Sequence, residues 1–289
     1  MTSPAESTST ATISDGFVDT IDFTGKVVFV AGGTSGINLG IAEDFARAGA
    51  RVAVMSRSAD KVDATVARLH QLGAEAIGAS ADVRDYTAVE AALTAAHAHF
   101  GDIDVLISGA AGNFPAAALG LSPNGFKSVV DIDLLGSFNV ARAAYQFLRK
   151  PGASVISISA PQALLPSITQ AHVCAAKAGV DMLTKVLALE WGPAGVRMNA
   201  VIPGAIDGTE GMSRLAPTEQ DRALITDSVP LRRLGTRRDV ANVVRFLASP
   251  LASYVSGVVL AADGGWSLGG AASTISAIGQ PLLDTLDRQ

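Results

Sequence analysis

The chain has 289 residues, of which 48% are hydrophobic, and this is enough for one large α/β domain with a full core. Charged residues make up 17% of the chain, against about 25% in an average soluble domain. That low share fits either apolar surface buried between subunits or a large core. The net charge of −5 excludes a general basic field that would attract nucleic acid. The single cysteine, Cys174, cannot form an internal disulfide, which fits a reducing compartment.

The first 20 residues are rich in Ser and Thr and lack the basic start and the apolar stretch of a secretory signal. We predict that residues 1–20 form a flexible extension. No stretch of the chain reaches the roughly 18 consecutive apolar residues of a membrane span. We therefore expect a cytoplasmic protein without a membrane partner.

From Lys26 onward, short apolar runs alternate with helical patterns such as 41–48, 62–72 and 89–100. The strand-like runs are residues 27–31, 52–56, 76–79, 105–108, 155–158, 198–202 and 258–261. Strands that alternate with helices predict βαβ units and a parallel sheet, and right-handed crossovers make that sheet doubly wound. The predicted fold is a single Rossmann-type α/β domain over residues 21–268.

Two segments interrupt or follow this alternation. Residues 205–226 break the pattern, and we predict that they form a helical flap over the functional site. Residues 269–289 follow the last strand and begin with Gly, Ala and Ser. We interpret them as a C-terminal tail that is either a loose end or an interface arm.

A glycine-rich turn follows the first strand and opens a helix. Glycines at such a turn let backbone N–H groups approach a pyrophosphate, and the helix N-terminus adds a favourable partial charge. The turn therefore predicts a dinucleotide, with contacts from Gly32, Thr34, Ser35, Gly36 and Ile37.

The end of the second strand indicates which dinucleotide is bound. It reads Met55-Ser56-Arg57, and it lacks the acidic residue that would bind the ribose hydroxyls of NAD(H). Ser56 and Arg57 can instead bind a 2′-phosphate, for which the guanidinium fork of Arg is well shaped. We therefore predict NADPH as the cofactor.

From about Phe23 to Leu268 the chain resembles the short-chain dehydrogenase/reductase family. That family has a Tyr four residues before the equivalent of Lys177 and a Ser thirteen residues before the Tyr. Here the two positions hold Val173 and Ala160, whose side chains cannot donate a hydrogen bond or a proton.

Two further departures concern the cofactor motifs. Asn38 replaces the third Gly of the family's TGxxxGxG turn, where its side chain could crowd the cofactor or alter how the helix packs. In the turn after the fourth strand, Ser108-Gly109 stands in place of the Asn pair of the family's Asn-Asn-Ala-Gly motif.

The runs Ala111-Gly112-Asn113-Phe114 and Gly208-Thr209-Glu210-Gly211 look like those of 2,4-dienoyl-CoA reductases, and of the peroxisomal type more than the mitochondrial. That subgroup likewise lacks the Tyr. A ketone reductase must protonate the carbonyl oxygen, whereas a dienoyl thioester takes hydride at the far end of its conjugated system. The thioester oxygen then needs hydrogen bonds as an enolate, and the proton goes to a carbon.

The resemblance implies roles for individual residues. Lys177 would hold the nicotinamide ribose, Asn113 would donate to the thioester oxygen, and Asp133 would anchor Lys177 or a proton-delivering water. His172 is a candidate proton source, because its unperturbed pKa of roughly 6.5 suits that task. Loop capping for Asn113, simple pairing with Lys177 for Asp133 and packing for His172 remain as alternatives. The remaining cofactor contacts that the resemblance implies are Asp82, Val83, Ala110, Ala111, Gly112, Pro203, Gly204 and Ile206.

The resemblance also implies an acyl-CoA substrate and a homotetramer formed through helices around 133–145 and 172–189. Five arginines in or after the flap could bind the CoA phosphates, namely Arg214, Arg232, Arg233, Arg237 and Arg238. The four histidines have no metal-ligand spacing, so we expect no metal.

Three functions remain open. The first is NADPH-dependent reduction of a 2,4-dienoyl-CoA in the β-oxidation of unsaturated fatty acids, which the intact Lys177 and Asn113 favour. The second is an oxidoreductase of the same fold that acts on another carbonyl or enoyl substrate. The third is a non-catalytic nucleotide sensor or scaffold, which Asn38, Val173 and Ala160 favour.

Overall fold

The computed structural model describes residues 21–285. The predicted extension over residues 1–20 lies outside the described residues. Seven parallel strands form one sheet in the order β3-β2-β1-β4-β5-β6-β7, which confirms the predicted doubly wound α/β fold. The strands are β1 Val27–Ala31, β2 Arg51–Ser56, β3 Ala76–Ser80, β4 Val105–Ser108, β5 Ser154–Ile158, β6 Arg197–Pro203 and β7 Val259–Ala262. Each one matches a predicted apolar run to within one residue at either end.

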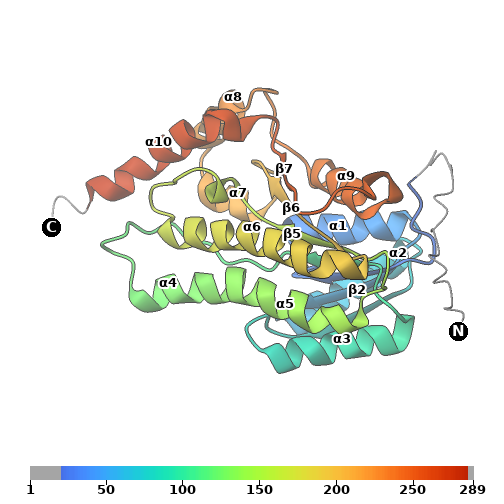
Figure 1. Ribbon diagram of the computed structural model, residues 1–289. Helices are drawn as coiled ribbons and strands as arrows, with labels where there is room; N and C mark the ends of the chain where they lie inside the picture. Colours follow the sequence, from blue (N-terminus) through green and yellow to red (C-terminus); the bar gives the residue numbers. More distant parts are fainter. Residues whose placement is uncertain (1–20, 286–289) are drawn as a thin grey trace, which may run out of the picture.

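Helices cover both faces of the sheet (Figure 1). Side chains of α1, α2 and α9 form one hydrophobic core, and those of α3, α5 and α6 form the other. All five residues of β1 are buried, because Val28 and Val30 face the first core while Val27 and Phe29 face the second. The helices are α1 Gly36–Arg47, α2 Ala59–Gln71, α3 Tyr86–Phe100, α4 Pro123–Val130, α5 Gly136–Ala144, α6 Ala171–Trp191, α7 Glu210–Leu215, α8 Glu219–Ser228, α9 Arg237–Ala248 and α10 Gly270–Asp284.

The chain reverses its direction of winding between β1 and β4, which are neighbours in the sheet. In open α/β sheets, ligands bind in the crevice outside the carboxyl ends of the strands at this point.

Short polar caps fix where the flanking helices begin. The side chain of Asp85 accepts a hydrogen bond from Ala88 N at 3.1 Å, so α3 begins earlier than the predicted helical pattern.

The predicted flap contains two helices, α7 and α8, capped by Thr209 and Thr218. Its apolar side packs against α10 in a third cluster that includes Met212, Ile225, Trp266 and Ile275. The helix α10 occupies most of the segment that we interpreted as a tail. Its opening glycine allows a close contact, since a Cβ at Gly270 would lie 2.1 Å from the carbonyl oxygen of Ser228.

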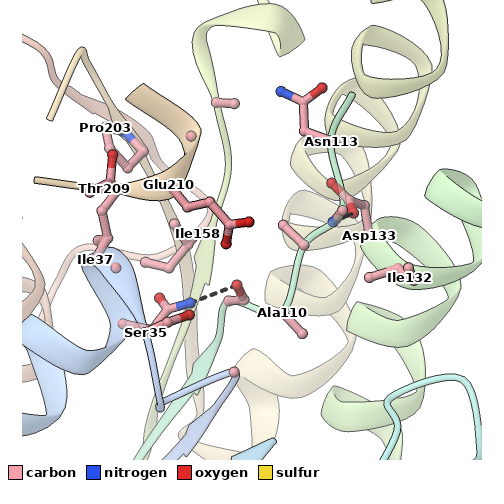
Figure 2. A pocket seen from close by; sticks show the side chains of 18 of the residues that line it. Ser35, Ile37, Ala110, Asn113, Ile132, Asp133, Ile158, Pro203, Thr209 and Glu210 are labelled. Atoms are coloured by element: carbon pink, nitrogen blue, oxygen red, sulfur yellow. Dashed lines mark hydrogen bonds between the residues drawn. The ribbon is translucent and has the colours of Figure 1, made fainter. Parts of the chain in front are cut away.

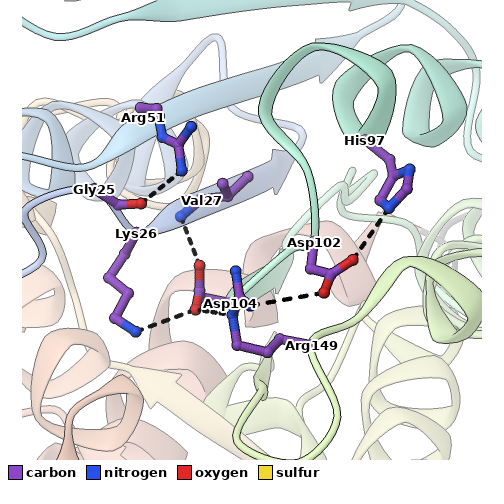
Figure 3. A network of polar contacts seen from close by, with 8 residues as sticks. All are labelled: Gly25, Lys26, Val27, Arg51, His97, Asp102, Asp104 and Arg149. Atoms are coloured by element: carbon purple, nitrogen blue, oxygen red, sulfur yellow. Dashed lines mark hydrogen bonds and ion pairs between the residues drawn. The ribbon is translucent and has the colours of Figure 1, made fainter.

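A polar network joins β1 to β4 at the amino ends of the strands (Figure 3). Asp104 precedes β4, and its Oδ2 accepts a hydrogen bond from Val27 N at 2.9 Å. Its Oδ1 accepts one from Arg149 Nε at 2.7 Å and lies 3.3 Å from Lys26 Nζ. Burial favours the neutral acid, but the hydrogen bonds from Arg149 and Val27 and the nearby positive charges hold the pKa of Asp104 below its usual range.

We expect Asp104→Asn to lower the free energy of unfolding by about 2 kcal/mol at neutral pH, because charge-assisted hydrogen bonds to a buried acceptor are lost. The folded-state pKa lies below the unfolded value of roughly 3.9, so this stabilisation is complete above that value. It disappears as the pH falls through the folded-state pKa. Thermal unfolding of both proteins at neutral and acidic pH measures the difference.

The matched control is Asp102→Asn, because the Asp102 side chain is 50% exposed and pairs with His97 and Arg149. We expect a loss below about 0.5 kcal/mol for this control. Equal losses in the two variants at neutral pH would contradict the role that we assign to Asp104.

Candidate active site

A cavity of about 400 Å³ opens at the carboxyl ends of the central strands, where the doubly wound topology predicts it. Every cofactor contact that we predicted from the sequence lines this cavity. Figure 2 shows Ser35 and Ile37 on one wall, Ala110 and Asp133 across from them, and Glu210 pointing into the space between the walls.

The glycine-rich turn closes one end of the cavity. Gly32 and Gly36 have φ values of +78° and +55°, which glycine adopts without steric cost. A Cβ at Gly32 would lie 2.8 Å from Ala110 N, so the turn touches the loop after β4. Ser35 precedes α1 without a hydrogen bond from its side chain to the helix. The first N–H groups of α1 are therefore left without a side-chain cap, as an anion-binding helix start requires.

The adenosine end of the cavity carries Ser56, Arg57, Asp82 and Val83. Arg57 is exposed at its mouth. A hydrogen bond from Arg84 holds the pKa of Asp82 below its ordinary value, and the charge of Arg57 acts in the same direction. Asp82 is therefore engaged by Arg84, and Arg57 is the cation that can meet a phosphate here.

The reaction end is built around Lys177 and Asp133, which are both buried. Lys177 Nζ donates a hydrogen bond to the carbonyl oxygen of Ile158 at 3.0 Å and lies 3.4 Å from Asp133 Oδ2. Asp133 Oδ1 accepts a hydrogen bond from Gly112 N at 2.7 Å. One carboxylate thus connects the lysine of α6 with the loop that carries Asn113.

Asp133 lies in a π-helical turn, Asp131–Leu135, between α4 and α5. Such turns are rare and occur frequently at functional sites. Ser137 Oγ donates to the main-chain oxygen of Asp133 at 2.6 Å and holds the turn in place. No pattern in the sequence predicts this irregular turn.

Asn113 lines the cavity beside this pair, and its Oδ1 is buried without a hydrogen-bond partner. Its main-chain oxygen accepts a hydrogen bond from Arg214 Nη1 at 2.6 Å. Arg214 also pairs with Glu210 one turn earlier on α7. The flap is therefore joined to the Asn113 loop across the cavity.

His172 does not join this group. Its side chain is fully buried, it does not line the cavity, and its ring packs edge-on against Phe114 with 4.7 Å between the ring centroids. Its Nδ1 accepts a hydrogen bond from Val173 N at 3.0 Å. A proton source must reach the cavity, so the structure favours the packing alternative for His172 over the proton donor that we expected.

The two positions of the missing Tyr and Ser do face the cavity. Val173 and Ala160 line it and present only hydrocarbon there. Other polar residues to which the sequence alone assigns no individual role also line the cavity, among them Ser159, Gln162 and Glu210. Ser159 directly follows the predicted fifth strand, and Glu210 lies in a run that we had singled out, so both could have been proposed from their positions.

A second buried carboxyl lies one turn beyond Lys177 on α6. Burial raises the pKa of Asp181, and the nearby Ser159 hydroxyl and the charges of Lys177 and Lys185 oppose that increase only in part. Asp181 does not itself line the cavity, so we assign it no direct contact with a substrate.

Of the five arginines predicted as candidates for the CoA phosphates, one lines the cavity and four, including Arg238, do not. Arg214 lines the cavity. Arg232, Arg233 and Arg237 instead hold nearby loops, through the main-chain oxygen of Asp227, the side chain of Asp239 and the main-chain oxygen of Gly208 respectively.

Within residues 21–285, no group of three or more His, Cys, Asp or Glu side chains is placed to hold a metal ion. Over the same part of the chain, no helix combines the length and the apolar character that crossing a membrane requires.

The sequence matches a family model and several proteins of known activity. A family model described as "Enoyl-(Acyl carrier protein) reductase" matches residues 31–267. The peroxisomal 2,4-dienoyl-CoA reductase [(3E)-enoyl-CoA-producing] of Rattus norvegicus is 47% identical over 242 residues, which are 83% of either chain. The protein of the same description from Saccharomyces cerevisiae is 45% identical over 253 residues, or 86% of either chain.

Solved structures agree with these matches. The crystal structure of a short chain dehydrogenase from Bacillus anthracis is 35% identical, with a TM-score of 0.74 over 84% of this chain and 96% of that one. Likeness of this extent, in sequence and in fold, shows that the chain belongs to the short-chain dehydrogenase/reductase family of oxidoreductases.

Proposed function

We propose that this protein reduces a 2,4-dienoyl-CoA to an enoyl-CoA with NADPH in the oxidation of unsaturated fatty acids. The observation that carries the proposal is the buried Lys177–Asp133 pair beside Asn113, at a site where Val173 and Ala160 replace the proton donor of a ketone reductase. The names of the rat and yeast relatives support the same substrate.

The residues present fit the cofactor. Bound NADPH would supply the hydride. The N-terminus of α1 and the turn at Gly32 suit its pyrophosphate, and Arg57 suits its 2′-phosphate. Lys177 has three N–H donors. One meets the Ile158 oxygen and another faces Asp133, so the third is left for the hydroxyls of the nicotinamide ribose.

The substrate needs an electrostatic site for its thioester oxygen. Hydride addition at the far end of the diene moves negative charge to this oxygen, and donors in a site shielded from water stabilise that charge strongly. The Asn113 amide donates to the oxygen, and the positive charge of Lys177 lowers the energy of the dienolate. Asp133 anchors Lys177 through its Oδ2, which lies 3.4 Å from Lys177 Nζ, and the same oxygen accepts a hydrogen bond from the water that delivers the proton to carbon.

The buried ion pair also bears on the choice between an enzyme and a scaffold. Removing two charges from water costs several kcal/mol per ion, and a buried pair is weak evidence for stability. A protein that only had to fold would gain little from a buried Lys177–Asp133 pair in this place. A reaction that develops negative charge gains directly from the lysine.

We further propose a homotetramer. Large apolar side chains are exposed on α5 and α6, among them Phe138, Met182 and Leu189, of which Leu189 is 80% exposed. A second subunit over these helices would bury them. Localisation in the cytoplasm remains a prediction.

The first test is oxidation of NADPH with a 2,4-dienoyl-CoA, beside a simple ketone and a trans-2-enoyl-CoA. We expect turnover of the dienoyl thioester, and we expect Asn113→Ala to lower kcat by about 100-fold, as loss of one donor to a developing oxyanion does elsewhere. The control is Asn124→Ala, at an exposed Asn on α4 outside the cavity. A preference for the ketone, or full activity of Asn113→Ala, would refute the proposal.

A second prediction concerns the choice of cofactor. Replacing Arg57 with Ala should weaken NADPH binding by about 10- to 100-fold and leave NADH binding unchanged, because only NADPH has the 2′-phosphate. Calorimetric titration of both nucleotides measures this difference. Arg47→Ala serves as the control, because Arg47 lies at the end of α1, pairs with Glu43 and does not line the cavity. If Arg57→Ala weakens both nucleotides equally, Arg57 does not select the phosphate.

A third prediction concerns the connection between the flap and the Asn113 loop. We expect Arg214→Ala to raise the KM for the acyl-CoA by about tenfold, since one charge-assisted hydrogen bond is lost, and to leave the Kd of NADPH unchanged. Arg222→Ala is the matched control, because Arg222 pairs with Asp207 on the flap outside the cavity. An unchanged KM in Arg214→Ala would show that the connection does not order the acyl-CoA site.

A further inference from the structure

Two departures from the family's cofactor motifs lie against each other in the fold. Asn38 is on α1, at the position of the third glycine of the glycine-rich turn. Gly109 is in the loop after β4, at a position where the family's motif has an asparagine. The two residues are 71 positions apart in the sequence, yet both line the same cavity.

Their contact is direct. Asn38 Nδ2 donates a hydrogen bond to the main-chain oxygen of Gly109 at 2.6 Å. A Cβ at Gly109 would lie 2.3 Å from Asn38 Oδ1 and 2.5 Å from its Cγ. The carboxamide of Asn38 therefore occupies the space in which a side chain at position 109 would begin, and the two cannot coexist in this arrangement.

The second polar atom of Asn38 has no partner. The residue is 8% exposed, and its Oδ1 is buried without a hydrogen bond. A buried acceptor without a donor costs free energy. The bond from Nδ2 to Gly109 fixes the carboxamide plane, so Oδ1 is held in one direction at the wall of the cavity.

Because Asn38 Oδ1 is an acceptor, only a hydrogen-bond donor can pair with it. Phosphate oxygens are acceptors and would be repelled by Oδ1. A hydroxyl can donate to it, and the ribose units of a dinucleotide carry hydroxyls on either side of the pyrophosphate. Because Asn38 lies on the first helical turns after the glycine-rich turn, a ribose hydroxyl beside the pyrophosphate is the donor in reach.

We propose that Asn38 and Gly109 are an exchanged pair. The carboxamide that the family's motif carries after β4 is supplied in this chain from α1, and Asn38 Oδ1 accepts a hydrogen bond from a ribose hydroxyl of the dinucleotide. Asn38 is then a cofactor-binding residue and does not crowd the cofactor as we expected from its sequence position. This inference rests on the nucleotide binding proposed above.

The test is a double-mutant cycle on the full chain, with Asn38→Gly, Gly109→Asn and the double variant that carries both changes. Two quantities are measured for each protein: the Kd of NADPH by calorimetry and the melting temperature without nucleotide. Asn38→Leu is added because leucine is of similar size but cannot form the hydrogen bonds.

We expect Asn38→Gly and Asn38→Leu each to weaken NADPH binding by about tenfold, as loss of one hydrogen bond does. Gly109→Asn alone should lower the melting temperature by about 5 °C and weaken binding further, because two carboxamides compete for one space. The double variant should recover the wild-type melting temperature and bind NADPH to within about threefold of the wild type.

Two results would overturn the inference while leaving the proposed function intact. One is wild-type affinity for NADPH in Asn38→Leu, and the other is a double variant whose losses equal the combined losses of the single variants. A wild-type protein that binds neither NADPH nor NADH would instead overturn the proposed function, and this inference with it.

Discussion

The site depends on one buried carboxylate. Asp133 accepts a hydrogen bond from the backbone of Gly112 with one oxygen and lies beside Lys177 with the other. It thereby sets the distance between a cation on α6 and the loop that presents Asn113. Without it, Lys177 would be an unpaired charge in a buried place, and the loop would lose the contact that orients it. The π-helical turn that holds Asp133 is the local irregularity that makes this bridge possible.

The bridge explains why the site can dispense with a phenol. A ketone reductase needs an acid at the atom beside the one that receives hydride. In a conjugated thioester the charge moves away from the hydride acceptor, so the site must stabilise an oxygen anion and exclude competing acids. Val173 and Ala160 line the cavity with hydrocarbon where that acid would stand, while Lys177 and Asn113 line the same cavity and are the donors that we propose for the oxygen. Low polarity around these two donors strengthens their interaction with the anion.

Much of this arrangement was predictable from the sequence, because it follows from short-range patterns. Runs such as Val27–Ala31 are buried on both faces, so their apolar character marks the strands directly. The glycine-rich turn and Arg57 occupy fixed places after such strands, which brings them to one edge of the sheet. His172 was different, because its ring is buried against Phe114, a residue far away in the chain, and its own sequence position does not reveal that contact. The helix α10 was obscured by its opening glycine, Gly270, which lies too close to the main-chain oxygen of Ser228 for a side chain.

Asn38 is a further residue whose role depends on a contact with a distant part of the chain. Judged by its own position, it is an unfavourable substitution that puts a side chain beside a pyrophosphate site. Judged together with Gly109, it fills a space that the loop after β4 leaves empty and supplies the carboxamide that this loop lacks. Neither residue can be interpreted from its own motif, since each is tolerated because of the other. Departures from a motif in this family are therefore best assessed together with the residues they contact in the site. Two residues that share one wall of the cavity can compensate for each other even when they are far apart in the sequence.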